Sequence, residues 1–154
     1  MDRLTDDQYT AAADIFSGAS IGKHYRHIIE FFQCVYLANE TDTICYDNRL
    51  RDTRMENDRI FAKESLKDLK SELGEVDNEK FLTLIGALGI DDQLSGSYML
   101  TSLLRELHYA IEHAIHHMAI IRMGVKQAFP EVYISVDFGV APSTLRYHQS
   151  AKSG

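Results

Sequence analysis

The alternation of apolar and polar residues predicts long amphipathic helices. In residues 21–38 the apolar side chains return every three or four positions, which is the spacing of one helix face. Ser20, immediately before this segment, is a typical N-cap residue. The same spacing predicts a helix over 54–73 and a longer one over 98–129, which Pro130 ends.

The remaining segments are shorter or irregular. A short helix is expected over 5–14, and residues 80–90 are either a short hairpin strand or a buried turn. Pro142 and two glycines favour an extended C-terminal tail that lies on the helices, with a frayed end. These elements predict an all-α fold in which residues 1–154 form one helical domain.

Composition narrows the class of partner and the compartment. Apolar residues make up 45% of the chain, the net charge is −7, and the pI is near 5.4. This acidic balance argues against nucleic acid or an anionic membrane as a partner. The chain shows neither an export signal nor an apolar run of membrane-spanning length. We therefore expect a cytoplasmic protein in which Cys34 and Cys45 are reduced thiols.

The histidines concentrate on two of the predicted helices. The chain has 7 histidines, and His113 and His117 are separated by four residues on the last long helix. They lie about 40° apart around the helix axis and one turn apart along it. Two imidazoles so placed can bind one ion from the same side, and His27 or His24 on another helix can supply a third ligand.

Three neutral imidazoles suit zinc, nickel, iron or copper, and they leave coordination positions open, as in catalytic sites. The alternative is that these histidines are hydrogen-bonded core residues or exposed residues without a ligand. Sharper motifs are excluded by the residues present. Ala114 stands where a zinc protease needs its glutamate, and the chain has no Glu-x-x-His pair of the di-iron type.

Two segments together resemble a known family. "SIGKHYRHIIEFF" (20–32) followed by "EHAIHHMAIIR" (112–122) is similar to the DinB-like superfamily. These are four-helix metalloproteins related to bacillithiol S-transferases and mycothiol-dependent maleylpyruvate isomerases. The resemblance implies a four-helix bundle of up-up-down-down type, here with a short first helix and an extended C-terminal tail. It also implies that His27, His113 and His117 bind a divalent ion, with zinc the first candidate and nickel, iron or manganese the alternatives.

The chain departs from the family pattern at two points. Only a short helix fits before the first motif, where family bundles usually begin with a full-length one. The Arg-Gly-Gln that often follows the second ligand is replaced by Met118, Ala119 and Ile120. The second departure makes the last helix more apolar and puts a polar role after the ligand in doubt.

Neighbouring polar residues are candidates to assist the ion, although no catalytic residue is assigned. Glu30, one turn after His27, can orient a ligand or accept a proton. His24 and His116 can form hydrogen bonds near the site. The alternatives are a solvated helix face for Glu30 and plain packing for the two histidines.

The connection over residues 45–52 is a candidate substrate-binding segment. Tyr46, Arg49 and Arg51 lie there, and in an up-up-down-down bundle this connection can cross one end. An arginine there can bind the carboxylate of a substrate or of a thiol cofactor. The alternative is a surface loop held by Arg–Asp pairs.

These observations favour a metal-dependent enzyme that transfers a low-molecular-weight thiol to a small-molecule electrophile. A metal-dependent hydrolase would use the same residues. The third alternative is a non-catalytic helical protein in which the metal is structural. Homodimers are common in the resembled family, and the spread of Phe31, Phe32, Cys34 and Tyr36 around one helix allows such a contact.

Overall fold

The computed structural model describes residues 1–76, 79–86 and 97–151. The described residues form six α-helices: α1 (Asp6–Thr10), α2 (Ile21–Thr41), α3 (Thr53–Asn57), α4 (Arg59–Glu72), α5 (Leu103–Ala128) and α6 (Pro142–Ser150). Three 3₁₀ turns join them: η1 (Asp14–Phe16), η2 (Tyr46–Asn48) and η3 (Leu73–Glu75). The strands are β1 (Thr43–Ile44), β2 (Phe81–Gly86) and β3 (Ser97–Ser102).

The predicted all-α four-helix bundle is wrong, because the fold is mixed and includes a three-stranded sheet in the order β1-β2-β3. β1 pairs with β2 in parallel, joining Thr43 to Thr83, and β2 pairs with β3 antiparallel, joining Leu82 to Thr101. Ile44 and Leu82 turn into the core, where they are buried. The hairpin-strand alternative for residues 80–90 is thus confirmed over β2, and residues 87–90 lie outside the described residues.

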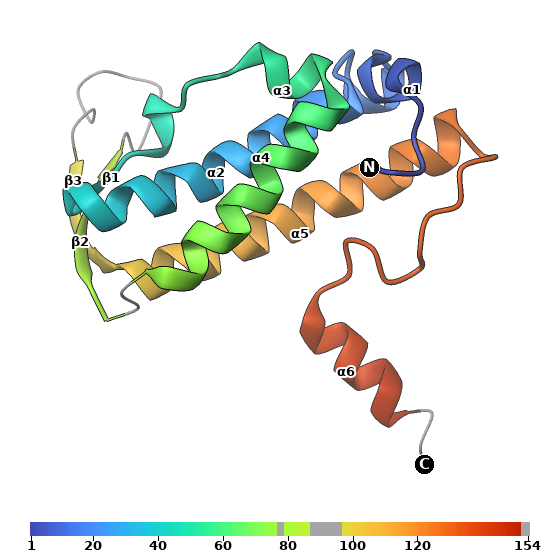
Figure 1. The fold of residues 1–154 in the computed structure, drawn as a ribbon. Coiled ribbons are helices and arrows are strands. Elements are labelled where there is room, and N and C mark those ends of the chain that lie inside the picture. The colour runs from blue at the N-terminus through green and yellow to red at the C-terminus, as the bar shows by residue number, and fades with distance from the viewer. Residues whose placement is uncertain (77–78, 87–96, 152–154) are drawn as a thin grey trace.

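The long helices begin where capping side chains dictate. Ser20 accepts a hydrogen bond from the Lys23 amide at 3.1 Å and starts α2, as predicted. The last helix starts at Leu103 and not at residue 98, because Ser102 caps it and the residues before it belong to β3. α2 and α5 pack side by side and run antiparallel along the length of the molecule (Figure 1).

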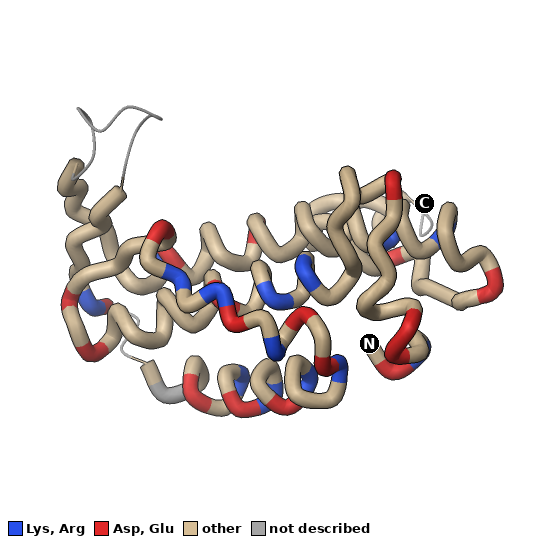
Figure 2. The backbone as a smooth tube through the Cα atoms, turned by 90° about the horizontal axis from the view of Figure 1, so that it is seen from above, with Lys and Arg blue, Asp and Glu red and all other residues tan. Residues whose placement is uncertain are grey.

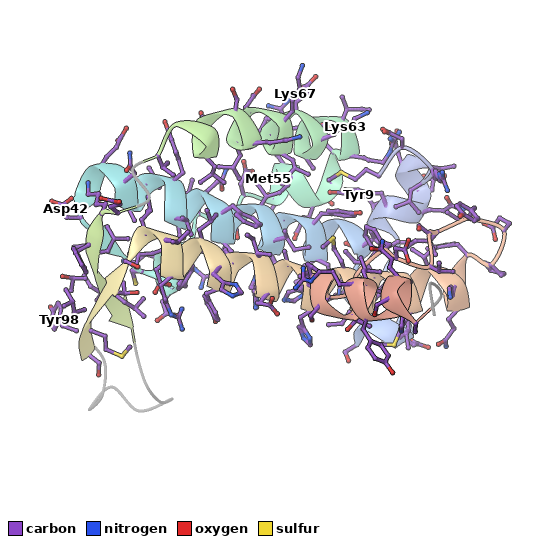
Figure 3. All side chains as sticks on the ribbon, turned by 90° about the horizontal axis from the view of Figure 1, so that it is seen from below. Tyr9, Asp42, Met55, Lys63, Lys67 and Tyr98 are labelled. Carbon is purple, nitrogen blue, oxygen red and sulfur yellow. The ribbon has the colours of Figure 1, made fainter. Side chains whose placement is uncertain are left out.

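The predicted helix over 54–73 is two helices. Asp58 ends α3 and caps α4, accepting a hydrogen bond from the Phe61 amide at 2.8 Å. α4 lies against α2 and forms an outer layer (Figure 1). Charged residues follow one another along it (Figure 2), and Lys63 and Lys67 project outward (Figure 3). Its outer face is therefore solvated.

The C-terminal tail differs from the prediction in its last part. Residues 129–141 are irregular, with turns at 130–131 and 136–139. Gly139, with φ +69°, fits closely enough that a Cβ would lie 2.3 Å from the Ala119 nitrogen. Pro142 then begins α6, because its fixed φ suits a first helical residue. α6 projects away from the other helices (Figure 1) and has no buried residue.

Two clusters of buried apolar side chains share the α2–α5 interface. The first includes Tyr9, whose hydroxyl donates to the Met55 carbonyl at 2.7 Å between α1 and α3 (Figure 3). The second includes Phe31, which is 5% exposed. On α5 the first cluster contains Ala114 and the second Ala110, so the border between them falls beside His113.

Within the described residues, no helix has the length and apolar character needed to cross a lipid bilayer. The side chains of α2 that were expected to allow a homodimer pack within the chain, since Phe31 is buried and Phe32, Cys34 and Tyr36 are half-buried against the two clusters. Self-association stays a prediction.

Candidate metal centre

Three histidines converge at the border between the two apolar clusters. His27 comes from the first half of α2, and His113 and His117 come from successive turns of α5. One ring nitrogen from each lies within 4.8 Å of the others, and the Nε2 atoms of His27 and His113 are 2.9 Å apart. The His117 ring lies edge-on to both others, with centroids 4.6 Å away in each case. We call these residues the His triad.

The spacing of the His triad fits a bound ion. Zinc with ligand bonds of about 2.0–2.1 Å in a tetrahedral arrangement places two nitrogens about 3.4 Å apart. The separations in the triad bracket this value, with 2.9 Å for the nearest pair and 4.8 Å as the upper limit.

The histidines of the triad are in the neutral form that binds a cation. Burial first, and then the neighbouring Arg49, lowers the pKa of His27 to about 4. Burial, and then His27, lowers the pKa of His117 to about 3. The pKa of His113 is lowered in the same direction, again mainly by burial. All three imidazoles are therefore neutral at pH 7, which is the form that ligates a metal.

A hydrogen bond between neutral imidazoles is the competing explanation of the closest contact. One Nε2–H can donate to the other Nε2 across the 2.9 Å between His27 and His113. This accounts for one pair, but it does not require a third imidazole at the same point. The approach of His117 to both rings is what favours a shared ion.

His24, predicted to assist the ion, contacts the His triad. Its Nδ1 lies 3.0 Å from Nδ1 of His117, so one of these nitrogens donates to the other. When Nδ1 of His117 carries the proton, it donates the hydrogen bond to Nδ1 of His24. Nε2 of His117 then keeps its lone pair for an ion. Phe16 lies edge-on to His24 at 5.1 Å and, with its ring over Gly124, closes that side of the site.

Glu30 and His116 are not among the converging groups of the triad, and their assisting roles stay predictions. Glu30 is only 1% exposed, so the alternative of a solvated helix face is excluded for it. Its carboxylate accepts the Asp52 amide at 2.8 Å and faces Arg26 and Arg49, and it is not among the groups that converge at the triad. His116 is exposed, with its ring 5.4 Å from that of His117.

The three candidate substrate-binding residues divide into two kinds. Tyr46 stacks on Phe31 at 4.7 Å and donates its hydroxyl to Glu106 at 2.9 Å. Arg49 lies over the same Phe31 ring at 5.0 Å. Arg51 points to the backbone, where it donates to carbonyls of the loop itself. Tyr46 and Arg49 thus approach the triad, and Arg51 shapes the loop.

Two aromatic residues next to the His triad were missed by the sequence reasoning. Phe31 stacks on His113 with ring centroids 4.0 Å apart, and Tyr109 lies 6.0 Å from the same ring. Each stands four residues from a triad histidine, Phe31 after His27 and Tyr109 before His113. That spacing was the available signal, because such residues share one helix face.

Cys34 is not among the side chains that converge at the triad in the described part of the chain. Burial raises the pKa of the Cys34 thiol to about 11, so it is protonated at pH 7. Its sulfur lies 3.7 Å from the Cys45 carbonyl oxygen. The group of converging nitrogens is made of imidazoles alone, so the triad would leave a divalent ion with its full charge.

A cleft of about 320 Å³ opens one helical turn from His113. α5, η2 and the β2–β3 hairpin supply its walls: Tyr46, Asp47, Leu84, Ile85, Gly86, Met99, Arg105, Glu106 and Tyr109. No triad histidine lines this cleft, and Tyr109, which borders it and also faces His113, is the side chain between the cleft and the triad.

Comparison with known proteins gives one partial likeness. No protein-family model matches the chain. FK506-binding protein 5 of Rhizopus delemar is 38% identical to it over 106 residues, which are 66% of this chain and 26% of that protein. The chain thus spans about a quarter of the length of this curated relative. No solved structure matches.

Proposed function

We propose that the protein is a metal-dependent enzyme whose divalent ion is bound by His27, His113 and His117, and that it transfers a low-molecular-weight thiol to an electrophile. The observation that carries the proposal is the convergence of three neutral imidazoles without a carboxylate or thiolate among them. Such a donor set leaves open positions and full positive charge on the ion. The resemblance to the DinB-like superfamily in the two histidine motifs supports the same choice.

The chemistry of the bound ion is to lower the pKa of a thiol or water that coordinates it. The surrounding residues position the triad and limit access of water. His24 holds His117 in one ring orientation through the 3.0 Å contact. Phe31 packs flat on His113 and shields one face of the site. The neighbouring cleft offers the aromatic rings of Tyr46 and Tyr109 to the apolar body of an electrophile.

A structural role for the ion is the second candidate. Its support is the position of the triad, which joins α2 to α5 at the border of the two apolar clusters. An ion there would link the two long helices and contribute to the free energy of folding. A hydrolase on the same residues is a variant of the first candidate and differs only in the nucleophile.

Substitution of His117 by Ala tests the proposal and separates the two candidates. The protein is purified without nickel resin, and its metal content and zinc affinity are measured. We expect the zinc affinity of His117→Ala to fall about 100-fold or more, because a direct ligand is lost. We expect the metal-free variant to stay folded, with a melting temperature within a few degrees of the metal-free parent.

His116→Ala is the matched control, since His116 is the adjacent histidine on α5 but is exposed. It should keep the metal affinity of the parent. Unfolding of the parent on chelation would instead favour the structural role. Assays with small thiols plus chlorodinitrobenzene, and with nitrophenyl esters, then distinguish transfer from hydrolysis. Stoichiometric metal without turnover of either substrate class would oppose the enzyme proposal.

A further inference from the structure

Arg49 is placed where it can act on a molecule bound at the His triad. Its guanidinium carbon lies 5.0 Å from the centre of the Phe31 ring. The same ring stacks on His113 at 4.0 Å and lies edge-on to His27 at 4.8 Å. A single aromatic ring therefore connects Arg49 to two of the three triad histidines.

The charge of Arg49 is balanced, but at least one of its hydrogen-bond donors has no partner among the described residues. Nε lies 3.8 Å from Oε2 of Glu30, which is close enough for an ion pair and too long for a hydrogen bond. Nη1 donates to the Tyr46 carbonyl. Nε is buried and has no hydrogen-bond partner in the described part of the chain. A guanidinium has five N–H donors, so it retains donors for a further acceptor.

The loop that carries Arg49 is held in place by its neighbours. Glu30 accepts the amide of Asp52 at 2.8 Å and so fastens the end of the loop to α2. Arg51 donates to the carbonyls of Asp47 and Arg49, at 3.3 and 3.4 Å. Arg51 itself has φ +52°, a conformation that costs a non-glycine residue free energy. The arginine is thus presented by a built segment.

The positive field of Arg49 extends over the triad. Arg49 lies over the Phe31 ring, which contacts both His27 and His113. An ion at the triad would add its own charge to the same region. A ligand that spans both positions binds most tightly when it is an anion with a planar group that accepts two N–H hydrogen bonds, as a carboxylate does.

We propose that Arg49 binds the carboxylate of the thiol substrate, so that the substrate is a small thiol acid whose sulfur lies at the triad and whose carboxylate lies on Arg49. This inference rests on the function proposed above and names its substrate class. Arg49 and His113 both contact the Phe31 ring, so the carboxylate and the sulfur of such a substrate would lie around this one ring.

Two probes that differ in the carboxylate test this directly. Mercaptopropionate and mercaptoethanol are titrated by calorimetry into the zinc-loaded protein, and propionate is titrated as the acid without a thiol. We expect mercaptopropionate to bind about tenfold or more tightly than mercaptoethanol, as for a charge-assisted hydrogen bond in a partly buried site. In Arg49→Gln this preference should disappear, while the three histidines still bind zinc.

Arg54→Gln is the control for net charge, because Arg54 is a largely exposed arginine of α3 and is 63% accessible at its side chain. It should keep the full preference. Arg49→Lys keeps the charge without the planar fork, and it should keep only part of the preference. The lysine variant also serves if Arg49→Gln does not fold, since thermal unfolding identifies that case.

Two results would overturn the inference. One is equal binding of both thiols to the parent protein. The other is a preference for mercaptopropionate that persists in Arg49→Gln, which would place the carboxylate on the metal. If neither thiol binds, the thiol chemistry proposed above fails, and propionate then decides the role of Arg49: equal binding of propionate to the parent and to Arg49→Gln overturns it.

Discussion

Two buried carboxylates lie near the aromatic residues around His113, and they differ in the number of hydrogen bonds that they accept. Glu30 on α2 and Glu106 on α5 are each 1% exposed. Glu106 accepts hydrogen bonds from the hydroxyls of Tyr46 at 2.9 Å and Thr101 at 2.6 Å, and from the Arg105 guanidinium at 3.4 Å. Glu30 accepts one backbone amide, and its Oε2 has no hydrogen-bond partner among the described residues.

The hydrogen bonding of Glu106 is satisfied within the fold, whereas that of Glu30 is only partly satisfied. The hydrogen bonds of Glu106 join η2, β3 and α5, so its cost of burial is offset by partners within the fold. Glu30 lies 3.8 Å from both Arg26 and Arg49, so it balances charge without satisfying their donors. Unpaired buried polar groups are rare in folded proteins, so the region around Glu30 needs an explanation beyond packing.

The largest effect expected is that of Glu30→Gln. It removes the negative charge beside two half-buried arginines and leaves Arg49 without its counter-ion. The free energy of unfolding should fall by about 3 kcal/mol, since breaking a buried ion pair leaves an uncompensated charge. Denaturant unfolding of the metal-free protein measures this. A change below about 0.5 kcal/mol would contradict the assigned role of the carboxylate.

Lowering the pH should reduce the stability of the protein mainly through the histidines of the triad. The pKa of His27 is about 4 and that of His117 about 3 in the folded chain, against about 6.5 unfolded. Between these values the unfolded state binds more protons, so stability is fully present above pH 6.5 and decreases as the pH falls toward 4. The loss in the metal-free protein should be on the order of 2 kcal/mol, after allowance for partial solvent screening.

Unfolding at pH 7 and at pH 5 checks this expectation. The double variant with His27→Gln and His117→Gln should lose most of the pH dependence, whereas His116→Gln should keep it. An unchanged profile in the double variant would assign the dependence to other groups.

The smallest effect expected is that of Glu106→Gln, the same substitution at the other carboxylate. The amide oxygen still accepts one hydroxyl, and the second hydroxyl can turn to accept from the amide nitrogen. The free energy of unfolding should fall by about 1 kcal/mol. A loss larger than that of Glu30→Gln would reverse the comparison and make Glu106 the more demanding charge.

Local signals were enough to predict the parts of the site that lie on one helix. The spacing of His113 and His117 placed them on one face, and the cap at Ser20 placed the start of α2. That His27 meets the pair depends on how α2 packs against α5. The resemblance supplied this choice, whereas spacing alone left His24 open, and His24 contacts only one of the three.

The parts that depend on distant pairing were not predictable in the same way. β1 is two residues long and pairs in parallel with a strand about 40 residues further along, and no local pattern indicates such a contact. Residues 98–102 have enough apolar character to extend a helix pattern, and pairing with β2 makes them a strand instead. Glu30 was expected to serve the ion, and tertiary packing turns it toward the 45–52 loop.

The row of rings from His113 through Phe31 to Tyr46, with Tyr109 alongside, has a practical consequence. The chain has no tryptophan, so its ultraviolet emission comes from tyrosine. Two of the emitting phenols stand within one ring of the histidines, and occupancy there should alter their light output. Tyrosine fluorescence should therefore report the occupancy of the histidines without an attached dye.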